Sequence, residues 1–174
     1  LYDNLVTCNP NVTYVGADNS EGMYLGVQHL KKLGHKKIGY LSSALEAYVY
    51  QQRYLAFQQV MTKLGLPAYD SVMGNAFHVS VCLSRHLPRQ LKNSCTVILC
   101  RHDILAHSVL FYCNELGLRV PEDISILGYD DIPMCRYTTP PLSTIRQNRP
   151  ALGKSAFYAL SCHLNGVALS THML

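Results

Sequence analysis

The sequence lacks the features that mark several common classes of protein. No run of basic residues is longer than the pairs Lys31–Lys32 and Lys36–Lys37, so the chain carries no basic stripe for nucleic acid despite its net charge of +4. No apolar run approaches the length of a membrane-spanning helix, and Leu1 does not open a signal peptide. Internal repeats and low-complexity segments are absent as well. These absences favour an ordinary folded domain.

Motifs for catalysis and for metal binding are also missing. The sequence contains no G-x-S-x-G, no G-x-x-x-x-G-K-[ST] and no H-E-x-x-H. A dispersed triad would leave no such motif, so an enzyme remains an alternative, but nothing points to one. Cys95, Cys100 and His102 lie close in sequence, yet a strand between the cysteines and the lack of a second Cys/His pair do not suit zinc. We therefore expect no catalytic residue, no metal and no cofactor.

The composition indicates a chain with a sizeable core. Of 174 residues, 48% are hydrophobic and 15% are charged, which makes disorder improbable and suits one compact domain or one large lobe. The seven cysteines are odd in number and scattered through the expected strands and helices. This distribution favours buried free thiols in a reducing cytoplasm.

Expected strands and helices alternate along the chain, which predicts an α/β fold with a parallel sheet and helices on both faces. Asn19 is the expected N-cap of the first helix. The expected strands cover residues 14–17, 37–41, 71–73, 96–100, 124–129 and 142–145. The expected helices cover residues 19–33, 50–64, 78–91, 103–116 and 149–164, and most of them end next to a glycine.

The most informative stretch is Val120–Gln147, with the sequence VPEDISILGYDDIPMCRYTTPPLSTIRQ. Ile124–Leu127 is an apolar, β-branched run that suits a strand buried on both faces. Asp130 and Asp131 follow at the carboxyl end of that strand, which is where open parallel sheets bind ligands. Two prolines then hold the backbone extended before another short strand at Leu142–Ile145.

This stretch resembles the C-terminal signature of the lactose/galactose-repressor (LacI/GalR) family of bacterial transcription regulators. Three other segments agree with that family in order and spacing, namely VGADNSEG at 15–22, HLKKLGH at 29–35 and RYLAF at 53–57, where Ala56 replaces the usual glycine. The resemblance implies a periplasmic-binding-protein-like fold of type I. Such a fold has doubly wound parallel sheets in two lobes with an effector in the cleft, and one lobe would be truncated here.

The resemblance also implies a division of the chain. Residues 1–18 would end the N-terminal lobe, 19–143 would form the C-terminal effector-binding lobe, 144–166 would hold the crossover and an N-terminal-lobe helix, and 167–174 would begin the return to the C-terminal lobe. We interpret the chain as a fragment without the helix-turn-helix headpiece. Operator DNA would then be bound only through that headpiece, in the parent protein.

Four residues are implied to bind the effector. Asp130 can accept hydrogen bonds from adjacent hydroxyls of a sugar or nucleoside, although it could instead cap the following turn. Arg53 matches the arginine that reaches the effector from its helix, and its alternative is a solvated side chain. Asp3 matches a position that can face the cleft from the N-terminal lobe. His102 stands where the family often has a ligand-contacting asparagine.

Arg101, His102 and Asp103 occupy the position of the family's A-N-D motif. Asp103 is predicted to cap the next helix. Arg101 replaces a small residue, and is either a solvated strand end or a source of positive charge for an anionic effector such as a sugar phosphate. Phe77 lies near the family's aromatic position, although a gap-free alignment places Ala76 there, and a core role suits it equally. Arg101 and Phe77 are therefore further candidate contacts.

The helix after Asp103 is the candidate dimer interface, because it carries apolar residues on more than one face. In the family the corresponding helix pairs across the dimer axis, together with the segment near 132–137. A helix buried all round within its own lobe is the alternative. The apolar residues are Ile104, Leu105, Val109, Leu110, Phe111 and Leu116.

These observations predict the effector-sensing, dimerising domain of a cytoplasmic LacI/GalR-type repressor. Its partners would be a small effector, a sugar or sugar derivative, and a second copy of the chain, with no membrane. A periplasmic sugar-binding protein of a transporter shares the fold and is the alternative. The scattered cysteines and the Val120–Gln147 stretch favour the regulator.

Overall fold

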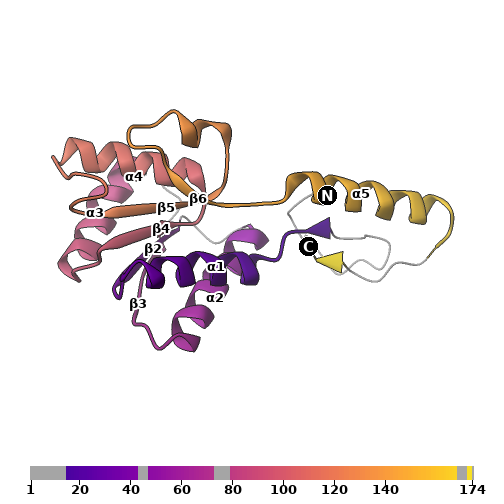
Figure 1. Ribbon diagram of the computed structural model, residues 1–174, viewed down its shortest axis with the longest axis horizontal. Helices are drawn as coiled ribbons and strands as arrows, with labels where there is room; N and C mark the ends of the chain where they lie inside the picture. The colour runs from indigo at the N-terminus through magenta and orange to yellow at the C-terminus, as the bar shows by residue number, and fades with distance from the viewer. Residues whose placement is uncertain (1–14, 43–46, 73–78, 168–171, 174) are drawn as a thin grey trace.

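The computed structural model describes residues 15–42, 47–72, 79–167 and 172–173, in which strands and helices alternate as predicted (Figure 1). The strands are β1 Val15–Gly16, β2 Ile38–Ser42, β3 Ala68–Val72, β4 Val97–Cys100, β5 Ser125–Asp130, β6 Ser143–Arg146 and β7 His172–Met173. The helices are α1 Asn19–Lys32, α2 Tyr48–Lys63, α3 Val79–Lys92, α4 Asp103–Glu115, the 3-10 helix η1 Pro133–Arg136, and α5 Arg149–Leu164.

Five of these strands form one parallel sheet in the order β3-β2-β4-β5-β6. Side chains alternate between its faces, so Val97 and Leu99 pack with α1 and α2, whereas Ile98 and Cys100 pack with α3 and α4. Both faces are covered by helices (Figure 1), which explains why β4 is apolar at every position. The parallel arrangement brings the carboxyl ends of β2, β4, β5 and β6 to one edge of the sheet.

A smaller part of the structure lies at the other end of the molecule from β3 (Figure 1). There β1 pairs with β7 in parallel, and α5 contacts β1. We predicted that residues 167–174 begin the return to the C-terminal lobe. In the structure, His172–Met173 pairs with β1 in this small sheet. Likewise, β6 pairs with β5 as far as Arg146, beyond the expected boundary at residue 143.

The N-cap predicted for the first helix was wrong by one residue. Asp18, and not Asn19, caps α1, because its Oδ1 accepts hydrogen bonds from the backbone N–H groups of Ser20 and Glu21 at 2.8 and 3.0 Å. Asn19 is instead turned inward and buried. None of the described helices has both the length and the apolar character needed to cross a membrane.

The helix α4 carries apolar side chains on more than one face, as predicted. Leu105 and Val109 are buried in the core, whereas Ile104, Phe111 and Leu116 are exposed by 66%, 66% and 48%. The helix is therefore not buried all round within its own lobe.

Among the cysteines whose side chains the structure describes, four are buried in or beside the helices and strands of the five-stranded sheet. Cys95, Cys100, Cys113 and Cys135 are buried as free thiols, and Cys162 is half-buried and free. Burial raises the pKa of Cys95 and of Cys113 to about 11. These thiols are therefore poor nucleophiles and act as small apolar side chains.

Candidate functional site

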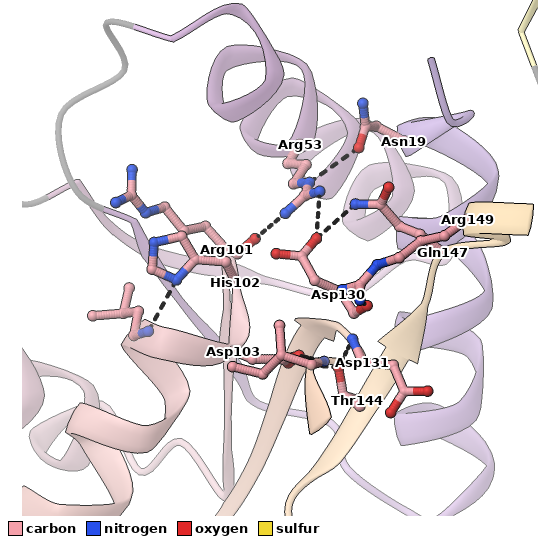
Figure 2. Close-up of polar contacts among 12 residues, drawn as sticks. Asn19, Arg53, Arg101, His102, Asp103, Asp130, Asp131, Thr144, Gln147 and Arg149 are labelled. Carbon is pink, nitrogen blue, oxygen red and sulfur yellow. Dashed lines mark hydrogen bonds and ion pairs between the residues drawn. The ribbon is translucent and has the colours of Figure 1, made fainter. Parts of the chain in front are cut away.

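Arg53 is the centre of a polar cluster at the carboxyl edge of the large sheet (Figure 2). This α2 side chain is only 2% exposed. Its Nε donates to Asn19 Oδ1 at 3.0 Å, its Nη1 to the Arg101 carbonyl oxygen at 2.6 Å, and its Nη2 to Asp130 Oδ1 at 2.8 Å. The guanidinium also stacks 3.9 Å from the centre of the Tyr129 ring. One side chain thus joins α1 and α2 to the ends of β4 and β5.

Asp130 is held from the crossover as well as from α2. Its Oδ1 also accepts from Gln147 Nε2 at 2.6 Å, and its carbonyl oxygen accepts from Arg149 Nη2 at 2.8 Å. Asp130 and Asp131 have φ angles of 117° and 52°, a left-handed backbone that non-glycine residues rarely adopt. Such strain persists where surrounding contacts enforce it, and it concentrates at functional sites.

Asp103 has a different role from the one predicted. It does not cap α4. Its fully buried carboxylate accepts from the backbone N–H of Ile132 at 2.8 Å and from Thr144 Oγ1 at 2.6 Å. A Cβ at Gly128 would collide with Asp103 Oδ1, so only glycine fits beside it. Asp103 therefore anchors the segment after Asp130 to β6.

His102 is the residue that caps α4. Its Nδ1 accepts a hydrogen bond from the backbone N–H of Leu105 at 2.9 Å. Burial, and secondarily the Arg101 cation, lower the pKa of His102 to about 4, so the ring is neutral at pH 7. A neutral imidazole that accepts at Nδ1 carries its proton at Nε2. Within the described part of the chain, no hydrogen bond uses this Nε2–H, so it can donate to another group.

The folded state is expected to lose stability as pH falls from the ordinary histidine pKa of 6.5 to about 4. Within this window the unfolded chain takes up a proton that folded His102 does not, so the free energy of unfolding decreases. His102→Asn keeps a good cap and removes the titration, so its decline should be shallower. Urea denaturation at pH 7 and pH 5 measures the difference. His163→Asn, on the exposed end of α5, is the matched control, and equal slopes for both variants would contradict this account.

Arg101 and His102 share an aromatic neighbour. The guanidinium of Arg101 lies 3.8 Å from the centre of the Tyr50 ring, and that ring meets His102 edge-on at 5.9 Å. Tyr50 belongs to the first turn of α2, one turn before Arg53. The start of α2 and the start of α4 therefore meet at this point.

The structure brings together Arg53, Arg101, His102 and Asp130, and it makes Arg53 and Asp130 direct partners. Asp3 and Phe77 lie outside the described residues. Sequence reasoning missed Asn19, Tyr50, Gln147 and Arg149. The position of Gln147 could have been predicted from the parallel pairing of β5 with β6. Residues that follow β6 must lie beside residues that follow β5, such as Asp130.

A separate pocket of about 140 Å³ opens where β5 and β6 begin, at the opposite edge of the sheet. Its lining contains no charged side chain and only two hydroxyls, those of Ser125 and Ser143, so it offers few polar groups to orient a polyhydroxylated ligand. The Arg53–Asp130 cluster is the stronger candidate site. The pocket is lined by Leu110, Val120, Pro121, Ser125, Ile126, Pro140, Pro141, Leu142 and Ser143.

Comparison with known proteins shows several similarities. Residues 27–173 match the family described as periplasmic binding protein-like domain. The chain is 36% identical over 156 residues to the HTH-type transcriptional repressor PurR of Haemophilus influenzae, covering 87% of this chain and 46% of that protein. It is 33% identical over 151 residues to the PurR repressor of Aliivibrio salmonicida, covering 85% and 45%. The chain thus spans about half the length of these curated relatives.

Solved structures show the same similarity. A LacI family transcriptional regulator from Enterococcus faecium with bound ribose superposes with a TM-score of 0.76 at 26% identity, covering 91% of this chain and 59% of that one. The lac repressor dimer bound to operator and the anti-inducer ONPF gives a TM-score of 0.80 at 26% identity, covering 92% and 56%.

Proposed function

This chain belongs to the family of periplasmic binding protein-like domains, and from that premise we propose that it is the effector-sensing and dimerising domain of a bacterial LacI/GalR-type transcriptional repressor. The effector is a small molecule, a sugar or sugar derivative, and the repressor acts in the cytoplasm. The observation that carries the proposal is the ion pair between buried Arg53 and half-buried Asp130 at the carboxyl edge of a parallel sheet, where such sheets bind ligands.

The chemistry of the cluster suits a hydroxylated ligand. Arg53 and Gln147 both donate to Asp130 Oδ1, and among the described residues no hydrogen bond reaches Oδ2. That oxygen can accept from a ligand hydroxyl, while His102 Nε2–H can donate to one. A hydroxyl both donates and accepts, so a sugar matches this pair of groups.

The same contacts offer a route from effector to DNA. Gln147 and Arg149 hold Asp130 from the segment that leads into α5 and the small sheet. A ligand at Asp130 competes with these contacts or reinforces them. It thereby favours one arrangement of the part that contains the five-stranded sheet relative to the part that contains β1, β7 and α5. In the full-length repressor, that arrangement sets the spacing of the headpieces on the operator half-sites.

The relatives favour a regulator over a transporter component. The curated relatives named above are repressors, and the ribose-bound and operator-bound neighbours are LacI-type regulators. A solute-binding protein of a transporter would share the fold but need no dimer. The exposed apolar side chains of α4 therefore support the regulator.

The dimer interface is expected to include the α4–η1 face, defined by Ile104, Phe111, Leu116, Met134 and Tyr137. These apolar side chains are 48–80% exposed. An isologous contact would place the face against its own copy and remove it from water. Phe111→Glu should convert the dimer to monomer in sedimentation velocity, because a buried charge would be repeated across the two-fold axis.

Leu25→Glu is the matched control, because Leu25 is an exposed apolar residue of α1 on the other side of the sheet. It should leave the dimer intact. A dimer that persists in folded Phe111→Glu would move the interface to another surface.

A thermal-shift ligand screen on the full-length protein tests the proposed function. A ligand that binds the native state raises the melting temperature, and the rise should be lost in Asp130→Asn. Glu122→Gln, an exposed carboxylate beyond the site, should keep the rise. Ligands that stabilise wild type and Asp130→Asn equally would place the effector elsewhere.

A further inference from the structure

Arg101 carries a positive charge that forms no ion pair with any acidic group of the described chain. Its Nε and Nη1 are buried and have no hydrogen-bond partner among the described residues. The ion pairs of the described chain involve Arg53, Arg119 and Arg146, and none involves Arg101. A guanidinium with two buried, unsatisfied donors needs an explanation, because native structures rarely leave such groups unpaired.

Three aspartates of this region bind other groups and form no ion pair with Arg101. Asp130 pairs with Arg53, Asp131 pairs with Arg146 Nε at 2.5 Å, and Asp103 holds Thr144. Arg101 stacks on Tyr50, and Tyr40 and Asp130 add a longer-range attraction, but burial nevertheless lowers the pKa of Arg101. The protein thus tolerates a half-buried cation that lacks an acceptor.

The side chain also stands on a fixed backbone. The Arg101 N–H donates to the Leu41 carbonyl oxygen at 3.0 Å, and the Arg101 carbonyl oxygen accepts from Arg53. Figure 2 shows the Arg101 and His102 side chains projecting next to each other. The Nε2–H of neutral His102, which has no acceptor among the described residues, adds a donor to the guanidinium donors. Arg101 and His102 thus place donors next to each other where the described residues supply no acceptor, and such a set of donors suits an oxyanion.

We propose that the effector carries an oxyanion, a phosphate or a carboxylate, which binds Arg101 and His102 while the hydroxyls of the same molecule bind Asp130. This inference rests on the proposed function and narrows its ligand from sugars in general to acidic sugar derivatives. Tyr50 forms the aromatic wall of the oxyanion subsite.

The test compares neutral and anionic probes on the full-length protein by isothermal titration calorimetry and thermal shift. The probes are inorganic phosphate, acetate, ribose, ribose 5-phosphate, glucose, glucose 6-phosphate and gluconate. A phosphorylated or carboxylated sugar should bind more tightly than its neutral counterpart. Arg101→Gln should weaken the anionic ligand by about 10–100-fold, because it removes a charge-assisted contact, and should leave neutral ligands unaffected. Comparing the affinities of the phosphorylated sugars and of gluconate shows which oxyanion the subsite prefers.

Arg89→Gln is the control, because it removes an exposed arginine from the end of α3 and should keep wild-type affinity. Arg101→Lys keeps a positive charge and should recover part of the anion binding. It therefore distinguishes loss of the charge from misfolding of Arg101→Gln. Equal affinity of wild type and Arg101→Gln for every anion, or no response of wild type to any anion, would overturn the inference. If either of these results is found but neutral sugars still bind through Asp130, the oxyanion inference fails and the proposed function stands. If no ligand depends on Asp130, the proposed function fails as well.

Discussion

Arg53→Met is expected to lower the free energy of unfolding by about 3–5 kcal/mol, the range found when one partner of a buried ion pair is removed. Methionine fills much of the arginine volume, so the loss reports the missing donors. Three hydrogen bonds are lost together, to Asn19 Oδ1, to the Arg101 carbonyl oxygen and to Asp130 Oδ1, which keeps only the bond from Gln147. Urea denaturation followed by circular dichroism measures the change.

Arg119→Met is the matched control. Arg119 also pairs with an aspartate, Asp123, but its side chain is 71% exposed, so little stability should be lost. The double variant Arg53→Met/Asp130→Leu should be more stable than Arg53→Met, because it leaves no unpaired carboxylate. Equal stabilities of Arg53→Met and Arg119→Met would show that Arg53 does not hold the site together.

Asp103→Ala is expected to cost about 1–3 kcal/mol, because it leaves two half-buried donors without their acceptor and water can replace that acceptor only in part. These donors are the Ile132 N–H and the Thr144 hydroxyl. The variant should also loosen the segment after Asp130, which hydrogen exchange at the Ile132 amide would report. The effector affinity should fall with it.

Thr144→Val provides the comparison for Asp103→Ala. It removes the short bond to Asp103 and the longer bond of 3.2 Å from the Asp131 N–H, but leaves the bond from the Ile132 N–H to the buried Asp103 carboxylate in place, so its cost should be smaller. If Asp103→Ala cost no more than Thr144→Val, and the Ile132 amide exchanged at its wild-type rate, Asp103 would not be the anchor described above.

The pattern of apolar residues was sufficient to predict the fold class. Strands such as Val97–Cys100 are apolar at consecutive positions because both faces of the sheet are covered, and the helices show the 3.6-residue period of one buried face. The short elements were harder. η1 and β7 contain too few residues for any period to show, and β7 is defined only by pairing with a strand far away in sequence.

Both N-caps were placed one residue too late, for the same physical reason. Asp18 and Asn19 can each cap in principle, as can His102 and Asp103, and local sequence does not decide between neighbours. Tertiary contacts decide. Asn19 accepts from Arg53, and Asp103 accepts from Ile132 and Thr144, so the preceding residue becomes the cap in each case.

The candidate site depended mostly on resemblance. Spacing alone placed Asp130 at a strand's carboxyl end, but it gave no reason to pair that residue with Arg53, which lies 77 positions earlier. The family motif supplied Arg53. Gln147 and Arg149 match no motif, and their contacts with Asp130 follow only from the register of β5 against β6.

The central claim is that a small molecule bound at Asp130 controls DNA binding by the full-length protein. Fluorescence anisotropy on operator DNA, with and without the ligand found by thermal shift, tests it most directly. We predict that the ligand changes the affinity for DNA, that DNA changes the affinity for the ligand by the same factor, and that Asp130→Asn abolishes both effects. A ligand that binds through Asp130 yet leaves the affinity for operator DNA unchanged would contradict the account.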